Sequence, residues 1–170
     1  LNRNSLKEEI PLSLGLGTDV ESMSGMYKMT HLDLSDNQLK DSIPQEMWEL
    51  AALNHLDLSG NQLTGTIPNN IDNMQYLTHL DLSDNQLKGD IPSEIGNLNY
   101  LTKLNLNNNQ FEEVRVGYNE VTGEISETIC NLSIIWSNPS IFNISNNMIC
   151  FPYPPCIEDY MGVQDTTNCD

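Results

Sequence analysis

The sequence predicts an α/β solenoid, in which short repeated coils stack into one elongated domain. The segment LDLSDNQL occurs at residues 32–39 and again at 80–87, and the close copy LDLSGNQL lies midway at 56–63, so the pattern returns every 24 residues. Apolar residues also recur at matching positions of each copy. Repeats of about 20–50 residues cannot bury an apolar face alone, and they bury it by stacking on their neighbours.

The first element expected in each coil is a strand, over residues 32–34 and the equivalent positions of later coils. In this segment Leu32, Asp33 and Leu34 alternate between apolar and polar with the period of two of a strand, which turns the leucines inward and the aspartate outward. We expect these strands to form a parallel sheet on the concave face of a right-handed solenoid.

An asparagine follows each expected strand at the same spacing, at Asn37, Asn61, Asn85 and Asn109. Its amide offers donors and an acceptor to backbone groups that the turn would leave unpaired, so we predict a structural column. Ile-Pro pairs come next, at 43–44, 67–68 and 91–92, and two of them follow a glycine. They predict an extended turn, because proline donates no hydrogen bond and glycine permits close backbone approach.

The remainder of each coil is expected to return to the next strand. Apolar residues spaced by about three between Ile43 and Leu53 predict 3₁₀ or short helical returns on the convex face. The side chains expected to form one continuous core are Leu32, Leu34, Leu39, Ile43, Met47, Leu50, Leu53, Leu56, Leu58, Leu63, Ile67, Ile71, Met74, Leu77, Leu80, Leu82, Leu87, Ile91, Ile95, Leu98 and Leu101.

The unit LTHLDLSDNQLKGDIPSEIGNLNY, residues 77–100, resembles the plant-type extracellular leucine-rich repeat LxxLxLxxNxLxGxIPxxIGxLxx. That repeat is found in plant receptor-kinase ectodomains, in polygalacturonase-inhibiting proteins and in similar secreted proteins of marine bacteria. The resemblance covers most of the chain and implies the leucine-rich-repeat fold. It does not identify a ligand.

The N-terminal coil departs from the period. Asn4 aligns with Asn37, 33 residues later, so nine extra residues are expected between them as an insertion on the return side. We expect no coil to cover Leu1, Leu6 and Ile10. An open parallel edge invites pairing with another chain, which predicts end-to-end self-association through this coil.

A second departure follows Asn109. The segment VRVGYNEVTGEI again shows the strand and asparagine pattern around Asn119, only ten residues later. We expect one irregular coil of 34 residues from Asn85 to Asn119, or one displaced strand. These observations divide the chain into a solenoid over 1–129, irregular near 12–22 and 110–119, and a last repeat with a cysteine-bearing cap over 130–170.

All four cysteines, Cys130, Cys150, Cys156 and Cys169, lie in the final quarter of the chain, where a solenoid needs a cap. Zinc is the competing interpretation, but no C-x-x-C pair and no nearby histidine supports a metal site. Four cysteines allow three pairings. The segment CFPYPPC resembles the cysteine-proline cap of plant-type repeats, and this resemblance implies Cys150–Cys156 and Cys130–Cys169. Disulfides favour an extracellular location, either secreted or at the cell surface.

Composition narrows the possible partners. The chain has 7 Lys+Arg against 24 Asp+Glu, a formal net charge of −17, which repels nucleic acid and anionic membranes. No apolar run is long enough to insert in a membrane. H-E-x-x-H, G-x-S-x-G, phosphate-loop and EF-hand patterns do not occur, so we expect neither an enzyme nor a cofactor.

The candidate binding residues are the outward positions of the concave face: His31, Asp33, His55, Asp57, His79, Asp81, Lys103, Asn105, Arg115, Tyr118 and Asn143. The first six repeat a consensus, whereas the last five depart from it and are expected to give selectivity. The simpler alternative is that the repeated H-L-D-L-S is consensus alone. Imidazoles beside carboxylates should have a raised pKa, so we expect binding of an acidic or neutral peptide to strengthen on mild acidification.

The sequence therefore predicts an extracellular module that binds a protein or peptide on its concave face. A structural spacer, or an adhesin-like segment of a longer protein, is the alternative from another class. Inhibition of a secreted glycan-degrading enzyme is a further alternative, and it rests on the resemblance to polygalacturonase inhibitors.

Overall fold

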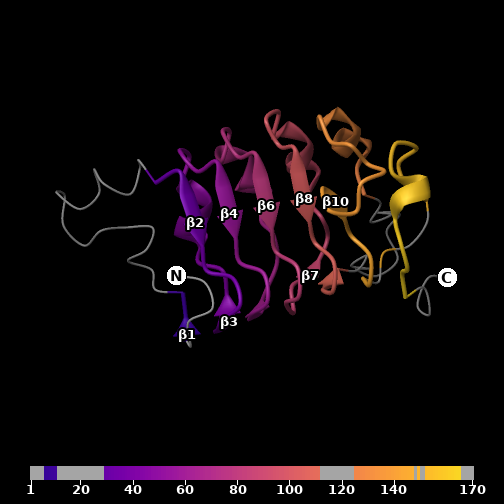
Figure 1. The fold of residues 1–170 in the computed structure, drawn as a ribbon. Coiled ribbons are helices and arrows are strands. Elements are labelled where there is room, and N and C mark those ends of the chain that lie inside the picture. Colours follow the sequence, from indigo (N-terminus) through magenta and orange to yellow (C-terminus); the bar gives the residue numbers. More distant parts are fainter. Residues whose placement is uncertain (1–5, 11–28, 112–124, 148, 150–151, 166–170) are drawn as a thin grey trace, which may run out of the picture.

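The computed structural model describes residues 6–10, 29–111, 125–147, 149 and 152–165. Short strands and 3₁₀ helices alternate along this part of the chain, and successive coils lie side by side (Figure 1). The strands are β1 (Lys7–Glu9), β2 (His31–Asp33), β3 (Gln38–Ser42), β4 (His55–Asp57), β5 (Gln62–Thr64), β6 (His79–Asp81), β7 (Lys88–Gly89), β8 (Lys103–Asn105), β9 (Gln110–Phe111) and β10 (Phe142–Asn143). The 3₁₀ helices are η2 (Gln45–Glu49), η3 (Asn69–Asn73), η4 (Ser93–Asn97), η5 (Glu127–Asn131) and η6 (Glu158–Tyr160).

The main sheet confirms the predicted concave face. It has five parallel strands in the order β10-β8-β6-β4-β2. From β2 to β8, residues 24 apart pair in register, as His31 does with His55. The middle residue of each strand points into the coil, whereas its two neighbours remain partly exposed. Leu56, for example, is fully buried between two half-exposed residues of β4.

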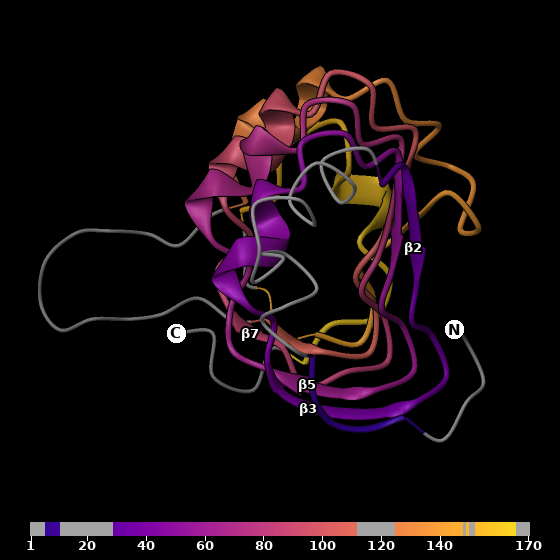
Figure 2. The ribbon, with the colours of Figure 1, turned by 90° about the vertical axis from the view of Figure 1, so that its left-hand side faces the viewer.

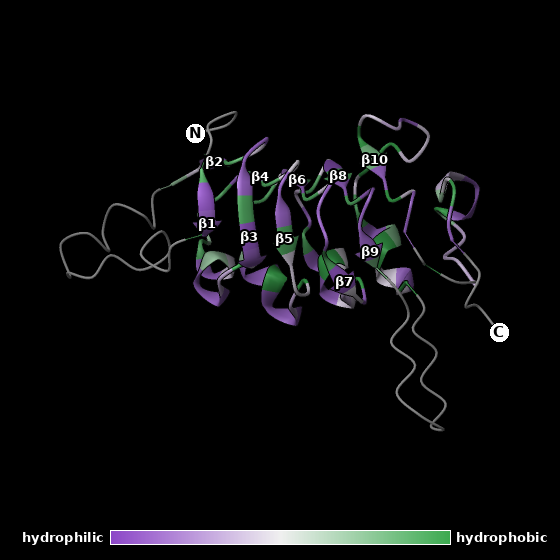
Figure 3. Ribbon diagram, turned by 90° about the horizontal axis from the view of Figure 1, so that it is seen from below, coloured by the Kyte–Doolittle hydropathy of each residue, from purple (hydrophilic) through white to green (hydrophobic). Residues whose placement is uncertain are grey.

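A second set of parallel strands, not predicted from the sequence, follows the main sheet in each coil. These strands pair in the orders β1-β3-β5 and β7-β9. They line a separate side of the solenoid between the main sheet and the helices (Figures 2 and 3). The predicted extended turn before each Ile-Pro pair is thus long enough to form strand pairs between neighbouring coils. Gly89 ends β7 at a φ of +76°, a left-handed conformation that glycine adopts without a Cβ clash.

The 3₁₀ helices η2 to η5 lie opposite the main sheet and close the coil (Figure 2), as predicted, whereas η6 belongs to the cap. Pro44, Pro68 and Pro92 precede η2, η3 and η4, where a fixed φ suits the first turn and a missing N–H costs nothing. The predicted core is confirmed, because every side chain assigned to it is 7% exposed or less. Trp48, Phe111 and Phe142 add the largest buried rings.

The asparagine column joins neighbouring coils. The Asn85 amide nitrogen donates to the carbonyls of Leu58, Leu82 and Ser83 at 3.0–3.1 Å, and its oxygen accepts from the Leu63 N–H at 3.0 Å. Asn37, Asn61 and Asn109 donate in the same way. This confirms the predicted structural role, and Asn147 extends the column by one coil.

The N-terminal coil is partly as predicted. The Leu6 N–H donates to Asn37 Oδ1 across 31 residues, against 22 for the equivalent bond from Leu39 to Asn61, so the coil carries the nine extra residues expected. The expectation that Ile10 is uncovered is wrong, because its side chain is 2% exposed. Leu6 is 36% exposed. Leu1, Asn4 and the insertion lie outside the described residues.

The irregular coil lies later than predicted. β8 pairs directly with β10, and Asn146 donates to Asn108 across 38 residues, whereas Asn108 donates to Asp84 across the regular 24. In the main sheet, β8 and β10 are therefore direct neighbours. The physical reason is that the core accepts Phe142 as the partner of Leu104, and η5 packs directly on η4. Residue 119 itself lies outside the described residues.

The disulfide also differs from the implied pairing. Cys130, in η5, is bonded to Cys156, with the two Cα atoms 5.7 Å apart. The pairs Cys150–Cys156 and Cys130–Cys169 are therefore wrong, because each would need a sulfur that this bond uses. The bond joins the last helix of the solenoid to the turn before η6, so it closes the cap onto the final coil. Cys150 and Cys169 lie outside the described residues.

Candidate binding face

The main sheet aligns the predicted site residues in columns. In the first, the imidazole column of His31, His55 and His79 is followed by Lys103, all in register on neighbouring strands. In the second, the aspartate column of Asp33, Asp57 and Asp81 is followed by Asn105 and Asn143. The structure thus brings nine of the predicted residues onto one face. Arg115 and Tyr118 lie outside the described residues.

Each aspartate is held by the serine two residues later. Ser35 donates to Asp33 Oδ1 from its N–H at 3.0 Å and from its hydroxyl at 2.7 Å, and Asp57 and Asp81 accept equivalent bonds from their own serines. Burial alone would raise the pKa of Asp33, but the bonds from Ser35 outweigh it and the pKa is lowered. The aspartates are thus fixed in orientation by their own coils.

The pattern changes at β8, where the charge on the face is reduced. The Asn105 amide donates to Asp81 Oδ2 at 3.0 Å and to the Ser83 hydroxyl at 3.2 Å, and Lys103 Nζ lies 3.6 Å from the same carboxylate oxygen. Asp81 is thus compensated by its neighbours on β8. In the main sheet, aspartates thus stand on β2, β4 and β6, and β8 carries none.

The imidazoles of the first column stack on one another. The ring centroids of His31 and His55 are 4.0 Å apart with 13° between the planes, and those of His55 and His79 are 5.4 Å apart with 28°. Burial, then the flanking imidazoles, lower the pKa of His55, and the nearby carboxylates of Asp57 and Asp33 only oppose this. The predicted rise of the histidine pKa is therefore wrong at His55, the central ring.

An aromatic pair at the edge of this face was not predicted. Tyr76 and Tyr100 lie where the chain enters β6 and β8, with ring centroids 6.2 Å apart and exposed fractions of 58% and 60%. The Tyr76 carbonyl accepts a bond from the Asn54 amide, which ties this turn to the preceding coil. The signal was present in the sequence, because the two tyrosines are 24 residues apart and each precedes a core leucine.

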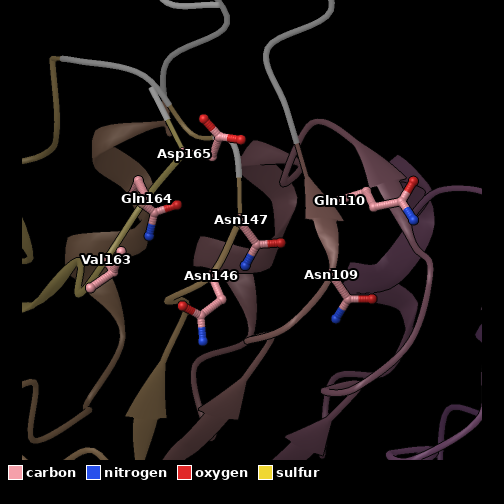
Figure 4. A pocket seen from close by; sticks show the side chains of 7 residues that line it. All are labelled: Asn109, Gln110, Asn146, Asn147, Val163, Gln164 and Asp165. Atoms are coloured by element: carbon pink, nitrogen blue, oxygen red, sulfur yellow. The ribbon is translucent and has the colours of Figure 1, made fainter. Parts of the chain in front are cut away.

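A pocket of about 420 Å³ lies between the last coil and the cap (Figure 4). Its lining includes Asn147 and Gln164, whose amides already bond backbone groups: Asn147 bonds the Leu106 carbonyl, and Gln164 bonds the carbonyls of Ile144 and Met161. These polar groups hold the cap in place. They therefore leave little capacity to recognise a ligand there.

Metal binding and membrane insertion were considered for the described part of the chain. Within it, no group of three or more His, Cys, Asp or Glu side chains is placed to hold a metal ion. None of its helices has the length and apolar character needed to cross a membrane.

Comparison with known proteins agrees with this geometry. A family model described as leucine rich repeat matches residues 16–63, and a second, for two copies of the repeat, matches residues 77–116. Comparison with curated protein sequences gave no match.

Among solved structures, the chain is similar to the Arabidopsis receptor kinase HAESA in complex with the peptide hormone IDA and the co-receptor SERK1. The identity is 28% and the TM-score 0.77, over 99% of this chain and 26% of that chain. The plant peptide hormone receptor RGFR1, in complex with RGF2, shares 30% identity at a TM-score of 0.66, over 87% of this chain and 20% of that chain. The chain thus spans about a quarter or less of these receptors.

A chain of the BIR3–SERK2 complex from Arabidopsis thaliana is of more similar size. It shares 33% identity at a TM-score of 0.67, and the alignment covers 92% of this chain and 71% of that chain. One family is indicated by the repeat, the parallel sheet, the 3₁₀ returns and these similarities. The chain belongs to the leucine-rich repeat family, whose domains are typically non-catalytic binding domains, and it is structurally similar to the ectodomains of plant receptor kinases.

Proposed function

We propose that this domain is a non-catalytic extracellular module that recognises a protein or peptide on its concave face. The observation that carries the proposal is the main sheet, whose outward side chains stand in register and partly exposed over a fully buried leucine layer. A rigid surface of this kind loses little conformational entropy when it binds an extended segment.

The comparisons support a partner of this class. The HAESA and RGFR1 structures contain peptide hormones, and the BIR3–SERK2 structure is a complex of two proteins. The Cys130–Cys156 disulfide favours an oxidising compartment, which agrees with a secreted or cell-surface domain. We place the solenoid at 1–129 and the last repeat with its cap at 130–170, so that this bond connects the two parts.

The test is capture of secreted proteins and peptides on the immobilised chain, with two variants compared. His55→Ala with Asp57→Ala removes outward side chains from the centre of the main sheet. Glu127→Ala with Glu158→Ala removes two exposed side chains from η5 and η6, away from that sheet. Circular dichroism first establishes that both variants are folded.

We expect a captured partner to be lost from the first variant and retained by the second. Equal capture by both variants would place the binding surface elsewhere. Failure of the wild-type chain to capture any partner would favour the structural spacer. End-to-end self-association is assessed in the same experiment, because a second copy of the chain would appear among the captured proteins.

A further inference from the structure

Three features of the concave face share one chemical preference. The tyrosine edge, Tyr76 and Tyr100, offers two exposed aromatic faces, and aromatic faces attract the guanidinium of arginine and the ammonium of lysine. Arginine also stacks on aromatic rings through its planar guanidinium. A pair with 58% and 60% exposed rings, fixed by two successive coils, is suited to such a contact.

The aspartate column gives the same preference at the centre of the face. Asp33 and Asp57 lie on neighbouring strands, about 4.8 Å apart in the pairing direction. One oxygen of each is occupied by its own serine, which holds the carboxylate in place. The whole chain carries a net charge of −17, so its long-range field also attracts a cationic partner.

One imidazole, that of His79, lies between these two features, since it follows Tyr76 by three residues and precedes Asp81 by two. The position equivalent to Tyr76 before His55 is Ala52. The charged and titratable groups facing His55 are His31 and Asp33 on β2, Asp57 on its own strand, and His79 and Asp81 on β6. At the other end of the column, His79 also faces Lys103 on β8. Stacking of the rings at 4.0 and 5.4 Å is compatible with neutral imidazoles. Protonation of neighbouring imidazoles would place like charges at those distances.

We propose that the concave face takes a basic peptide segment that crosses the strands, with one arginine or lysine side chain against the tyrosine edge and another against the aspartates of β2 and β4, and that protonation of the imidazole column weakens this binding. The inference rests on the proposed function and adds the charge class of the partner and its control by pH. A neutral imidazole column allows a cation to approach the carboxylates. A protonated column repels the cation of the peptide and interacts with the same carboxylates.

The experiment uses the full chain and two fluorescein-labelled probes of equal length. One carries arginine at every third position, and the other carries glutamate at those positions. Fluorescence anisotropy is measured one pH unit above and one below the ordinary imidazole pKa of 6.5. We expect the arginine peptide alone to bind, and its affinity to fall about fivefold or more at the lower pH.

Three variants identify the groups responsible. Replacing His31, His55 and His79 together by Gln should give the same affinity at both pH values. Tyr76→Ala with Tyr100→Ala should weaken binding about two- to fivefold. Tyr160→Ala is the matched control, because this tyrosine is 42% exposed on η6 and outside the face.

Several results would overturn the inference: equal binding of both probes, no binding of the arginine peptide, or an unchanged pH effect in the histidine variant. Equal losses in the tyrosine pair and in the Tyr160 control would do so as well. Each of these leaves capture of a neutral or acidic partner possible, so the proposed function is tested separately.

Discussion

The asparagine column makes a quantitative prediction for stability. Replacing Asn85 by alanine removes four hydrogen bonds from a side chain that is 9% exposed. The Leu63 N–H loses its acceptor inside the coil, which costs about 1–3 kcal/mol. Loss of the bonds to the carbonyls of Leu58 and Leu82 adds about 0.5–1.5 kcal/mol each. The free energy of unfolding should therefore fall by about 2–6 kcal/mol.

Urea denaturation followed by circular dichroism measures this loss, and hydrogen exchange of the Leu63 amide reports it locally. Asn99→Ala is the control, because Asn99 is exposed and bonds only the nearby Asn97 carbonyl among the described contacts. It should change stability by no more than about 0.5 kcal/mol. An Asn85→Ala variant as stable as this control, at unchanged m value, would refute the structural role of the column.

Three further predictions test the cap, a close contact and the imidazoles. Replacing Cys130 and Cys156 by Ser should lower the free energy of unfolding, measured by urea denaturation, by about 2–4 kcal/mol, since the bond closes a loop of 26 residues. Non-reducing peptide mapping that recovered another partner for either cysteine would contradict the structure. Gly96→Ala should lower the free energy of unfolding by about 1–3 kcal/mol, because a Cβ would overlap the Thr128 carbonyl, and an unchanged melting temperature would argue against that packing. NMR titration should give His55 a pKa below the unfolded-state value of 6.5. Its contribution to stability is then fully present above pH 6.5 and is lost as the pH falls through the lower folded-state pKa. His55→Gln should flatten this pH dependence, and a folded-state midpoint at or above 6.5 would count against it.

The regular coils were predictable because one physical constraint acts on every copy. Leu56, Leu80 and their equivalents must all be buried, and Asn61 and Asn85 must satisfy the same backbone groups, so the sequence repeats what the fold repeats. The second set of strands was not predicted, since β3 and β5 each contain a single buried apolar residue, Leu39 and Leu63. One apolar position gives no alternation to detect, whereas Leu32 and Leu34 flank Asp33 in the main sheet.

Prediction failed where the period changes, because a missing coil and an insertion leave similar sequence patterns. The segment around Asn119 shows strand and asparagine features, yet the ladder proceeds from Leu104 to Phe142. The disulfide failed for a related reason. Cys130 and Cys156 are brought within 5.7 Å by the packing of the last coil, a three-dimensional fact that their sequence spacing does not contain.

The error in the sign of the His55 shift shows what decides ionisation on a repeated face. Along a strand, an outward residue and the next one on the same face are about 6.6 Å apart, whereas across strands the rings of His31 and His55 are 4.0 Å apart. Coulomb energy falls with distance, so an imidazole is affected more by its copies in adjacent coils than by the aspartate in its own. A column of identical ionisable groups therefore opposes its own ionisation unless each coil also supplies a compensating partner. Asp33 has such a partner in Ser35, and its pKa is lowered, whereas for His55 burial and the flanking imidazoles outweigh the carboxylates. At Asp33 the hydrogen bonds from Ser35 favour the charged carboxylate in spite of burial, whereas at His55 burial and the flanking imidazoles favour the neutral ring.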